Sequence, residues 1–176
     1  MNRKNLIVAV FALVAVFAAS AQAAPKKVLS AKDVQTFIDN YEALSADLDA
    51  LEGKYDDLFT PEEGCDIPTA MAAVRAVKVP DEMRAIVKKH GLGDNGFEKI
   101  IVIAYSVSYV QLEKGIVELE GQAAEMPEMA GYLDQYRQQL AAMKSGIHPD
   151  DLETVRKRAD DLAAILGSEE GDGSEN

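Results

Sequence analysis

Residues 97–119 read FEKIIVIAYSVSYVQLEKGIVEL, and the first part of this run is apolar on nearly every side. Its β-branched residues would also suit a buried strand, so periodicity alone leaves residues 100–110 open between helix and strand. We expect a helix, because no second strand-like run is present to pair with it. Since a helix that is apolar all round belongs at the centre of a domain, residues 97–119 predict the core helix of an all-α fold.

The segment before this run carries a regular amphipathic pattern. Ser30 and Asp33 resemble a capping box, with Asp in place of the usual Glu. Apolar side chains then recur in alternating steps of three and four residues, at Val34, Phe37, Tyr41, Leu44, Leu48, Leu51, Tyr55 and Leu58. This heptad pattern predicts a long N-terminal helix with one narrow apolar seam.

The seam must lie against other helices, either of the same chain or of a second copy. If part of it stays exposed, its larger side chains would make good anchors for a protein partner. The candidate partner-binding residues are Phe37, Tyr41, Leu44, Leu48, Leu51 and Tyr55.

Shorter helical stretches fill the rest of the chain, and prolines and glycines separate them. The expected stretches are residues 68–77, 80–90, 129–143 and 152–166. In the second of them, acids lie in the first turn and bases in the last, and Gly91 follows as a helix stop. The last two stretches are expected to form a hairpin. The prediction is a bundle of about five to six helices around residues 97–119.

The first residues have the three parts of a secretory signal peptide. Arg3 and Lys4 precede an apolar run over residues 6–19, and the small residues of Ala21-Gln22-Ala23 follow. The run is shorter than the roughly 20 residues that span a bilayer comfortably, which disfavours an uncleaved anchor. We expect cleavage after Ala23, a periplasmic protein without a transmembrane segment in the mature chain, and leave secretion beyond the outer membrane open.

Size and charge restrict the class of protein further. Removing residues 1–23 from the 176 leaves 153, enough for one helical domain over residues 24–167. Residues 168–176 are acidic, without an apolar or basic residue, and are expected to be a disordered tail. The net charge is −12 for the whole chain, and a surface this acidic repels phosphate backbones, so we expect no nucleic acid partner.

Reactive side chains form no recognisable motif in this sequence. Cys65 is the only cysteine, so it is an idle thiol or one that pairs between chains, and its acidic neighbours disfavour catalysis. His90 and His148 lack ligand partners at metal-binding spacing, and we assign both to helix ends. We therefore expect no cofactor and no metal, and consider an enzyme the less favoured class.

Polar side chains inside the core run allow two interpretations. Ser106 and Ser108 are expected to bond back to helix carbonyls. Tyr105 and Tyr109 are four residues apart, which suits core packing. Alternatively, these two tyrosines line a small cavity for an apolar ligand.

The layout from Leu29-Ser30 through Phe37-Ile38, then Lys88-Lys89-His90-Gly91-Leu92 and the apolar run, resembles small exported all-helical proteins of Gram-negative bacteria. The resemblance covers roughly residues 29 to 112. It implies helical structure and export, and it brings no activity and no site residues.

Three functional hypotheses follow from these features. The first is a non-catalytic periplasmic interaction protein that binds another protein, or itself, through an amphipathic helix. The second is a carrier of a small apolar ligand within the bundle. The third is an enzyme whose site is assembled only by folding.

Overall fold

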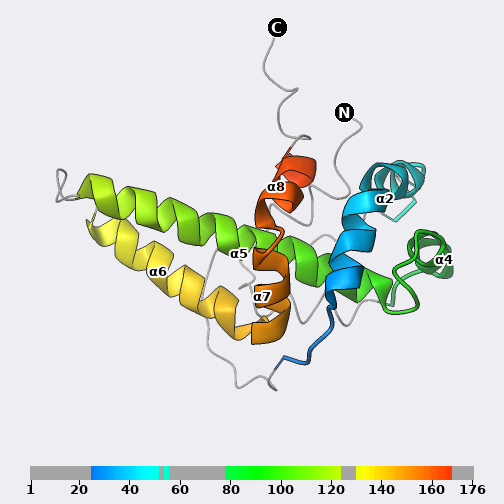
Figure 1. Cartoon of the computed structure of the whole chain (residues 1–176), viewed down its shortest axis with the longest axis horizontal. Helices are drawn as coiled ribbons and strands as arrows, with labels where there is room; N and C mark the ends of the chain where they lie inside the picture. The colour runs from blue at the N-terminus through cyan, green and yellow to red at the C-terminus, as the bar shows by residue number, and fades with distance from the viewer. Residues whose placement is uncertain (1–24, 52–53, 56–77, 124–129, 168–176) are drawn as a thin grey trace, which may run out of the picture.

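The computed structural model describes residues 25–51, 54–55, 78–123 and 130–167 (Figure 1). These residues form six α-helices and no strand, which confirms the all-α prediction. The helices are α2 (Ala31–Asp49), α4 (Asp81–Lys89), α5 (Gly96–Ala123), α6 (Ala130–Ser145), α7 (Pro149–Arg156) and α8 (Ala159–Gly167). The predicted signal peptide, the expected helix over residues 68–77, Cys65 and the acidic tail lie outside the described residues.

Helix α5 is the central element, as the apolar run predicts. It is 28 residues long, and α2, α4, α6, α7 and α8 all pack against it. Its N-terminal half is buried between two groups of side chains. One group comes mainly from α2, α4 and α8, and the other from α6 and α7. Residues 100–110 are therefore helical, because the surrounding helices can cover every side of an apolar helix.

By length and composition, Gly96–Gly121 is the one stretch within the described helices that could cross a membrane, and half of its most apolar window is buried. The core helix of a soluble protein has the same composition. Its burial among the other helices accounts for the apolar character of this stretch.

Helix α2 starts as the sequence predicts and ends earlier. The Ser30 side chain accepts a bond from the Asp33 N–H, and the Asp33 carboxylate accepts one from the Ser30 N–H at 2.8 Å. The helix ends at Asp49, however, so Leu51 and Tyr55 lie beyond it. Its last turn holds acids and no base, so no side chain within α2 offsets the negative end of the helix dipole.

The C-terminal part departs from the expected hairpin in two ways. The predicted helix over residues 152–166 is interrupted at residues 157–158, which separate α7 from α8. In addition, α6 packs along α5, antiparallel to it, rather than along the C-terminal helices (Figure 1). An ion pair between Glu120 and Arg137 joins these two helices, with 2.7 Å between Oε1 and Nη2.

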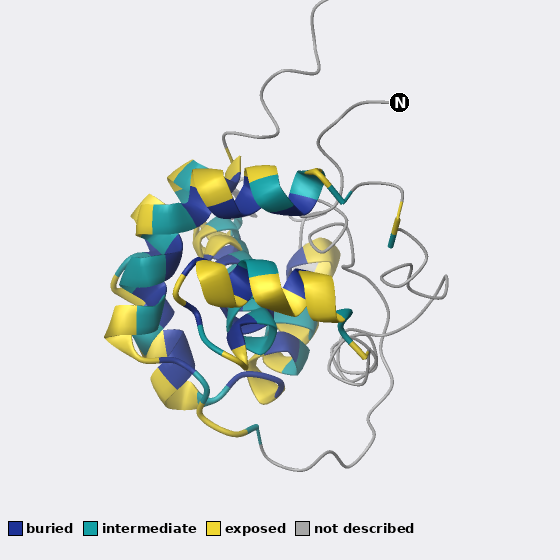
Figure 2. Cartoon of the chain, turned by 90° about the vertical axis from the view of Figure 1, so that its right-hand side faces the viewer, coloured by how far each residue is buried: buried dark blue, intermediate teal, exposed yellow. Residues whose placement is uncertain are grey.

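The end of α5 and the start of α6 together project away from the other helices (Figure 1). We name this projection the arm and define it as residues 111–123 and 130–140. The rest of the molecule has a buried interior and an exposed outer surface, which Figure 2 shows on the helices. The arm has helices on fewer sides, so its outer residues are covered by fewer neighbours.

Candidate functional site

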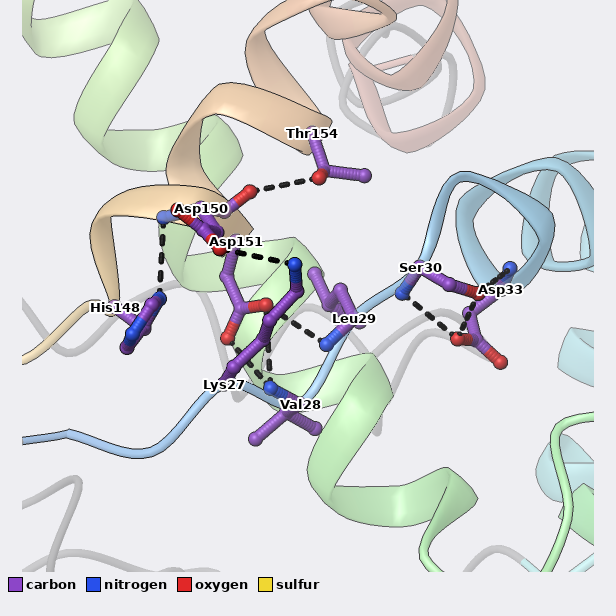
Figure 3. A network of polar contacts seen from close by, with 9 residues as sticks. All are labelled: Lys27, Val28, Leu29, Ser30, Asp33, His148, Asp150, Asp151 and Thr154. Atoms are coloured by element: carbon purple, nitrogen blue, oxygen red, sulfur yellow. Dashed lines mark hydrogen bonds and ion pairs between the residues drawn. The ribbon is translucent and has the colours of Figure 1, made fainter.

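A buried carboxylate joins the N-terminal segment of the described chain to α7 (Figure 3). Asp151 lies in the first turn of α7, and only 1% of its surface is exposed. Its oxygens accept hydrogen bonds from the backbone N–H of Val28 at 2.9 Å and of Leu29 at 2.8 Å. The Leu29 side chain is buried beside this contact. Asp151 thus holds the segment before α2 against the start of α7.

The residues around this carboxylate cap α7 and strengthen the contact. His148 is the N-cap residue, and its Nδ1 accepts a bond from the Asp150 N–H at 3.1 Å. Asp150 points outward instead and pairs with Lys27 at 2.9 Å, which lowers the pKa of this carboxyl. His148 therefore has the structural role expected from sequence. Backbone donors occupy both oxygens of Asp151, so this carboxylate is a structural anchor rather than a catalytic base.

A second polar cluster joins the ends of α2 and α4. His90 caps the C-terminus of α4, as expected, and is 9% exposed. Its Nε2 lies 2.7 Å from Oδ2 of Asp47, and Nζ of Lys89 lies 2.6 Å from the same oxygen. Bonds from Lys89 and then His90 lower the pKa of Asp47. Sequence reasoning missed this pair, because its members are 43 residues apart and only folding brings them together.

A third cluster fixes the start of α5. Nζ of Lys99 donates to Oδ1 of Asp33 at 2.6 Å and to the carbonyl of Leu92 at 2.9 Å. Burial of Asp33 opposes its ionisation, but the bonds from Lys99 and Ser30 outweigh that effect and lower its pKa. The same carboxylate therefore completes the capping box of α2 and an ion pair with α5.

The candidate ligand-cavity residues pack in the core. Tyr109 is buried, and its hydroxyl donates to Oε1 of Glu113 at 3.3 Å, while Glu113 pairs with Arg156. Burial, followed by the charge of Glu113, raises the pKa of Tyr109. Tyr105 is half-buried and packs against the same apolar cluster, which includes Met143. Both tyrosines thus contact the apolar cluster between α5, α6 and α7, and a ligand cavity beside them stays a prediction.

The two serines of α5 differ from one another. Ser108 Oγ donates to the carbonyl of Ala104 at 3.2 Å, which confirms the expected bond back to the helix. Ser106 is fully buried, and its Oγ has no hydrogen-bond partner among the described residues. The expectation was wrong for Ser106.

The N-terminal seam is closed by helices of the same chain. Phe37, Tyr41, Leu44 and Leu48 are buried, and the first two rings meet edge to face at 5.5 Å between their centroids. Leu51 and Tyr55 are half-buried against the same cluster. Helices α4, α5, α7 and α8 pack on α2. The seam therefore packs against helices of the same chain, and these six side chains do not form an open surface.

Exposed apolar surface occurs instead on the arm. Among the described residues, the exposed large hydrophobic side chains are Val117 at 64%, Tyr132 at 60% and Tyr136 at 38%. Tyr136 has helical spacing with Leu133 and Met143, yet only the latter two are buried. No sequence signal distinguishes these positions, because exposure depends on where the neighbouring helices end.

In the described part of the chain, no group of three or more His, Cys, Asp or Glu side chains is placed so that it could hold a metal ion. Comparisons with protein families, curated proteins and solved structures found no match to this chain. The arm and the three polar clusters are thus the features from which a function must be argued.

Proposed function

We propose that this protein is a non-catalytic helical interaction protein of the periplasm, and that it binds a protein partner through the arm. The observation that carries the proposal is the location of the exposed large hydrophobic side chains of the described residues. Val117, Tyr132 and Tyr136 all lie on the arm. Tyrosine is among the residues enriched at the centres of protein interfaces, because it offers a large rigid surface with a polar end.

The polar clusters support a binding role over a catalytic one. The Asp151 carboxylate is saturated by backbone donors, and Lys99 is held by Asp33 and a carbonyl. His90 and Lys89 share the Asp47 carboxylate at the junction of α2 and α4. Each cluster therefore joins elements of the fold, and these side chains are committed to structural contacts.

The periplasmic location in this proposal is supported by the sequence pattern of residues 1–23. A positive start, an apolar run and small residues before the expected cleavage site form a signal peptide pattern.

Site-specific photo-crosslinking in intact cells tests the proposal. A photoreactive residue at Tyr132 should form a protein adduct, because this side chain faces the partner in the proposed complex. The matched control is Asp94, whose side chain is 88% exposed and which lies just before α5, at the end of that helix opposite the arm. Adducts at Tyr132 and none at Asp94 would support binding by the arm. Equal labelling at both positions, or none at either, would overturn it.

A further inference from the structure

The register of the arm follows from its ion pair. Glu120 of α5 bonds Arg137 of α6, and these two helices run antiparallel. Among the arm residues whose burial the structure describes, Ile116 and Leu133 are the buried ones, so they mark the line along which its helices meet. Positions on either side of this line can therefore be assigned from helical geometry.

In an α-helix, the residue four positions on lies to one side of a given residue, and the residue three positions on lies to the other. Glu120 is four residues after Ile116, and Arg137 is four residues after Leu133. These two charges bond to one another, so they share one side of the arm. Leu119 is three residues after Ile116, and Tyr136 is three residues after Leu133. These two side chains therefore share the opposite side of the arm.

The same geometry extends this second side along both helices. Leu112 and Gly115 lie on it with Leu119, and Tyr132 and Gln139 lie on it with Tyr136. We name these residues the neutral face, because none carries a charge: Leu112, Gly115, Leu119, Tyr132, Tyr136 and Gln139. The charged residues of the described arm lie off it, at Glu113, Lys114, Glu118, Glu120, Asp134 and Arg137.

The neutral face presents aromatic and aliphatic side chains around a glycine with open space above it. Tyr132 and Tyr136 are exposed, and Leu112 and Leu119 are half-buried. A Cβ added at Gly115 would meet no atom within 4 Å, so there is open space at the middle of the face. An apposed side chain could occupy that space.

The distribution of charge on the surface favours a second copy of this chain as the partner. The net charge of −12 makes two copies repel one another, and this repulsion is smallest where the surfaces that meet carry no charge. A basic partner would instead require acids on the face, and the neutral face has none. Uncharged surfaces are compatible with themselves, which is the condition for an interface in which both copies use the same patch.

We propose that the neutral face pairs with the same face of a second copy, so that two arms form a four-helix arrangement about a two-fold axis. This inference rests on the proposed function, because it names the partner of the same arm. Beyond its base, where Glu113 and Lys114 pair with α7 and α8, the arm covers each of its two helices on one side only. A second arm would cover the tyrosines and both leucines of the first.

Analytical ultracentrifugation of the processed full chain tests this inference. The experiment is run under reducing conditions, so that a disulfide through Cys65 cannot produce a dimer. The wild type should sediment as a dimer, whose mass is twice that of the monomer. Tyr136→Arg should sediment as a monomer, because each copy then places a charge on the other's neutral face.

The matched control is Gln135→Arg, which introduces the same charge at an exposed position of the same arm. Gln135 is two residues after Leu133, about 200° further round α6, and so lies off the neutral face. This variant should therefore remain a dimer. Circular dichroism of both variants should show wild-type helix content.

The outcomes separate this inference from the proposed function. A monomeric wild type that still forms Tyr132 adducts with a different protein would overturn pairing of copies and leave the interaction role intact. A monomer without adducts would overturn both. A dimer that survives Tyr136→Arg would overturn the assignment to this face.

Discussion

Oδ1 of Asp151 accepts a hydrogen bond of 2.8 Å from the backbone N–H of Leu29, a residue 122 positions earlier in the chain. The contact is buried, and it places the start of the described chain against α7 rather than leaving it as a loose extension. A charged acceptor makes such a bond stronger than a neutral one, typically by a factor of about two. The first prediction concerns the stability that this single carboxylate supplies.

Replacing Asp151 with Ala should lower the free energy of unfolding by about 2–4 kcal/mol, because two backbone N–H groups then lose their buried acceptor. Urea denaturation followed by circular dichroism measures the change. Asp150→Ala is the matched control, since it removes only the exposed pair with Lys27 and should cost less than about 1 kcal/mol. Equal losses in the two variants would mean that Asp151 is not the anchor of the N-terminal segment.

Acid should destabilise the fold through carboxyls whose pKa is lowered by folding. Asp33 has a folded pKa below its usual 3.8, owing to the bonds from Lys99 and Ser30. Its contribution to stability is present above the unfolded pKa and is lost as pH falls through the folded value. The stability of the wild type should therefore decline as pH is lowered below about 4.

Urea titrations at a series of pH values measure this decline. In Asp33→Asn, position 33 no longer titrates, so the decline should be shallower than in the wild type. Asp39→Asn is an exposed control on the same helix. Identical pH profiles for the wild type and Asp33→Asn would exclude the Asp33–Lys99 pair as a source of acid sensitivity.

Gly91 should be more sensitive to substitution than Gly93. Both have positive φ angles, of 85° and 80°, which disfavour an L side chain by about 1–2 kcal/mol. Only at Gly91 would a new Cβ also press on a neighbour, Cγ2 of Thr36 at 3.1 Å. Gly91→Ala should therefore lower the free energy of unfolding by more than Gly93→Ala does.

Removing the Cγ2 methyl group of Thr36 tests whether its contact with the new Cβ causes the extra loss at Gly91. Gly91→Ala is expected to lose more free energy of unfolding than Gly93→Ala. Adding Thr36→Ser to Gly91→Ala should recover this difference, because serine lacks the Cγ2 methyl group. No recovery would show that backbone strain alone determines the cost at Gly91.

The N-terminal seam should act through stability and the arm through binding. Leu44 is fully buried, so Leu44→Ala should cost about 2–5 kcal/mol in the free energy of unfolding. Tyr132 is 60% exposed, and Tyr132→Ala should change stability by less than about 1 kcal/mol. Thermal and urea unfolding compare the two in the Tyr136→Arg background, which we expect to be monomeric, so that association makes no contribution. A small loss for Leu44→Ala would contradict the placement of the seam in the core.

Ser106 should be replaceable without loss. Its buried hydroxyl has no hydrogen-bond partner among the described residues, so Ser106→Ala removes an unsatisfied polar group and should be neutral or stabilising by up to about 1 kcal/mol. Ser108→Ala is the control that removes a bond to the Ala104 carbonyl. Urea denaturation measures both. A destabilised Ser106→Ala would indicate that its hydroxyl has a partner after all.

Local features of the chain were predictable from sequence, because their causes lie within a few residues. The capping box of Ser30 and Asp33 depends on contacts between residues three apart. The bounds of α4 follow from acids at its start, bases at its end and Gly91 after it. The central place of α5 follows from its composition, since a helix with apolar residues on all sides has to be covered.

Tertiary structure alone decided which surfaces are closed and which stay open. The heptads of α2 allowed packing within the chain or against a second copy, and only the position of the other helices settles this. Tyr136 and Met143 follow the same periodicity, yet the first is exposed on the arm and the second is buried near the body. Periodicity reports which side of a helix is apolar. Burial depends on neighbours that are distant in sequence, as the pairing of Leu29 with Asp151 also does.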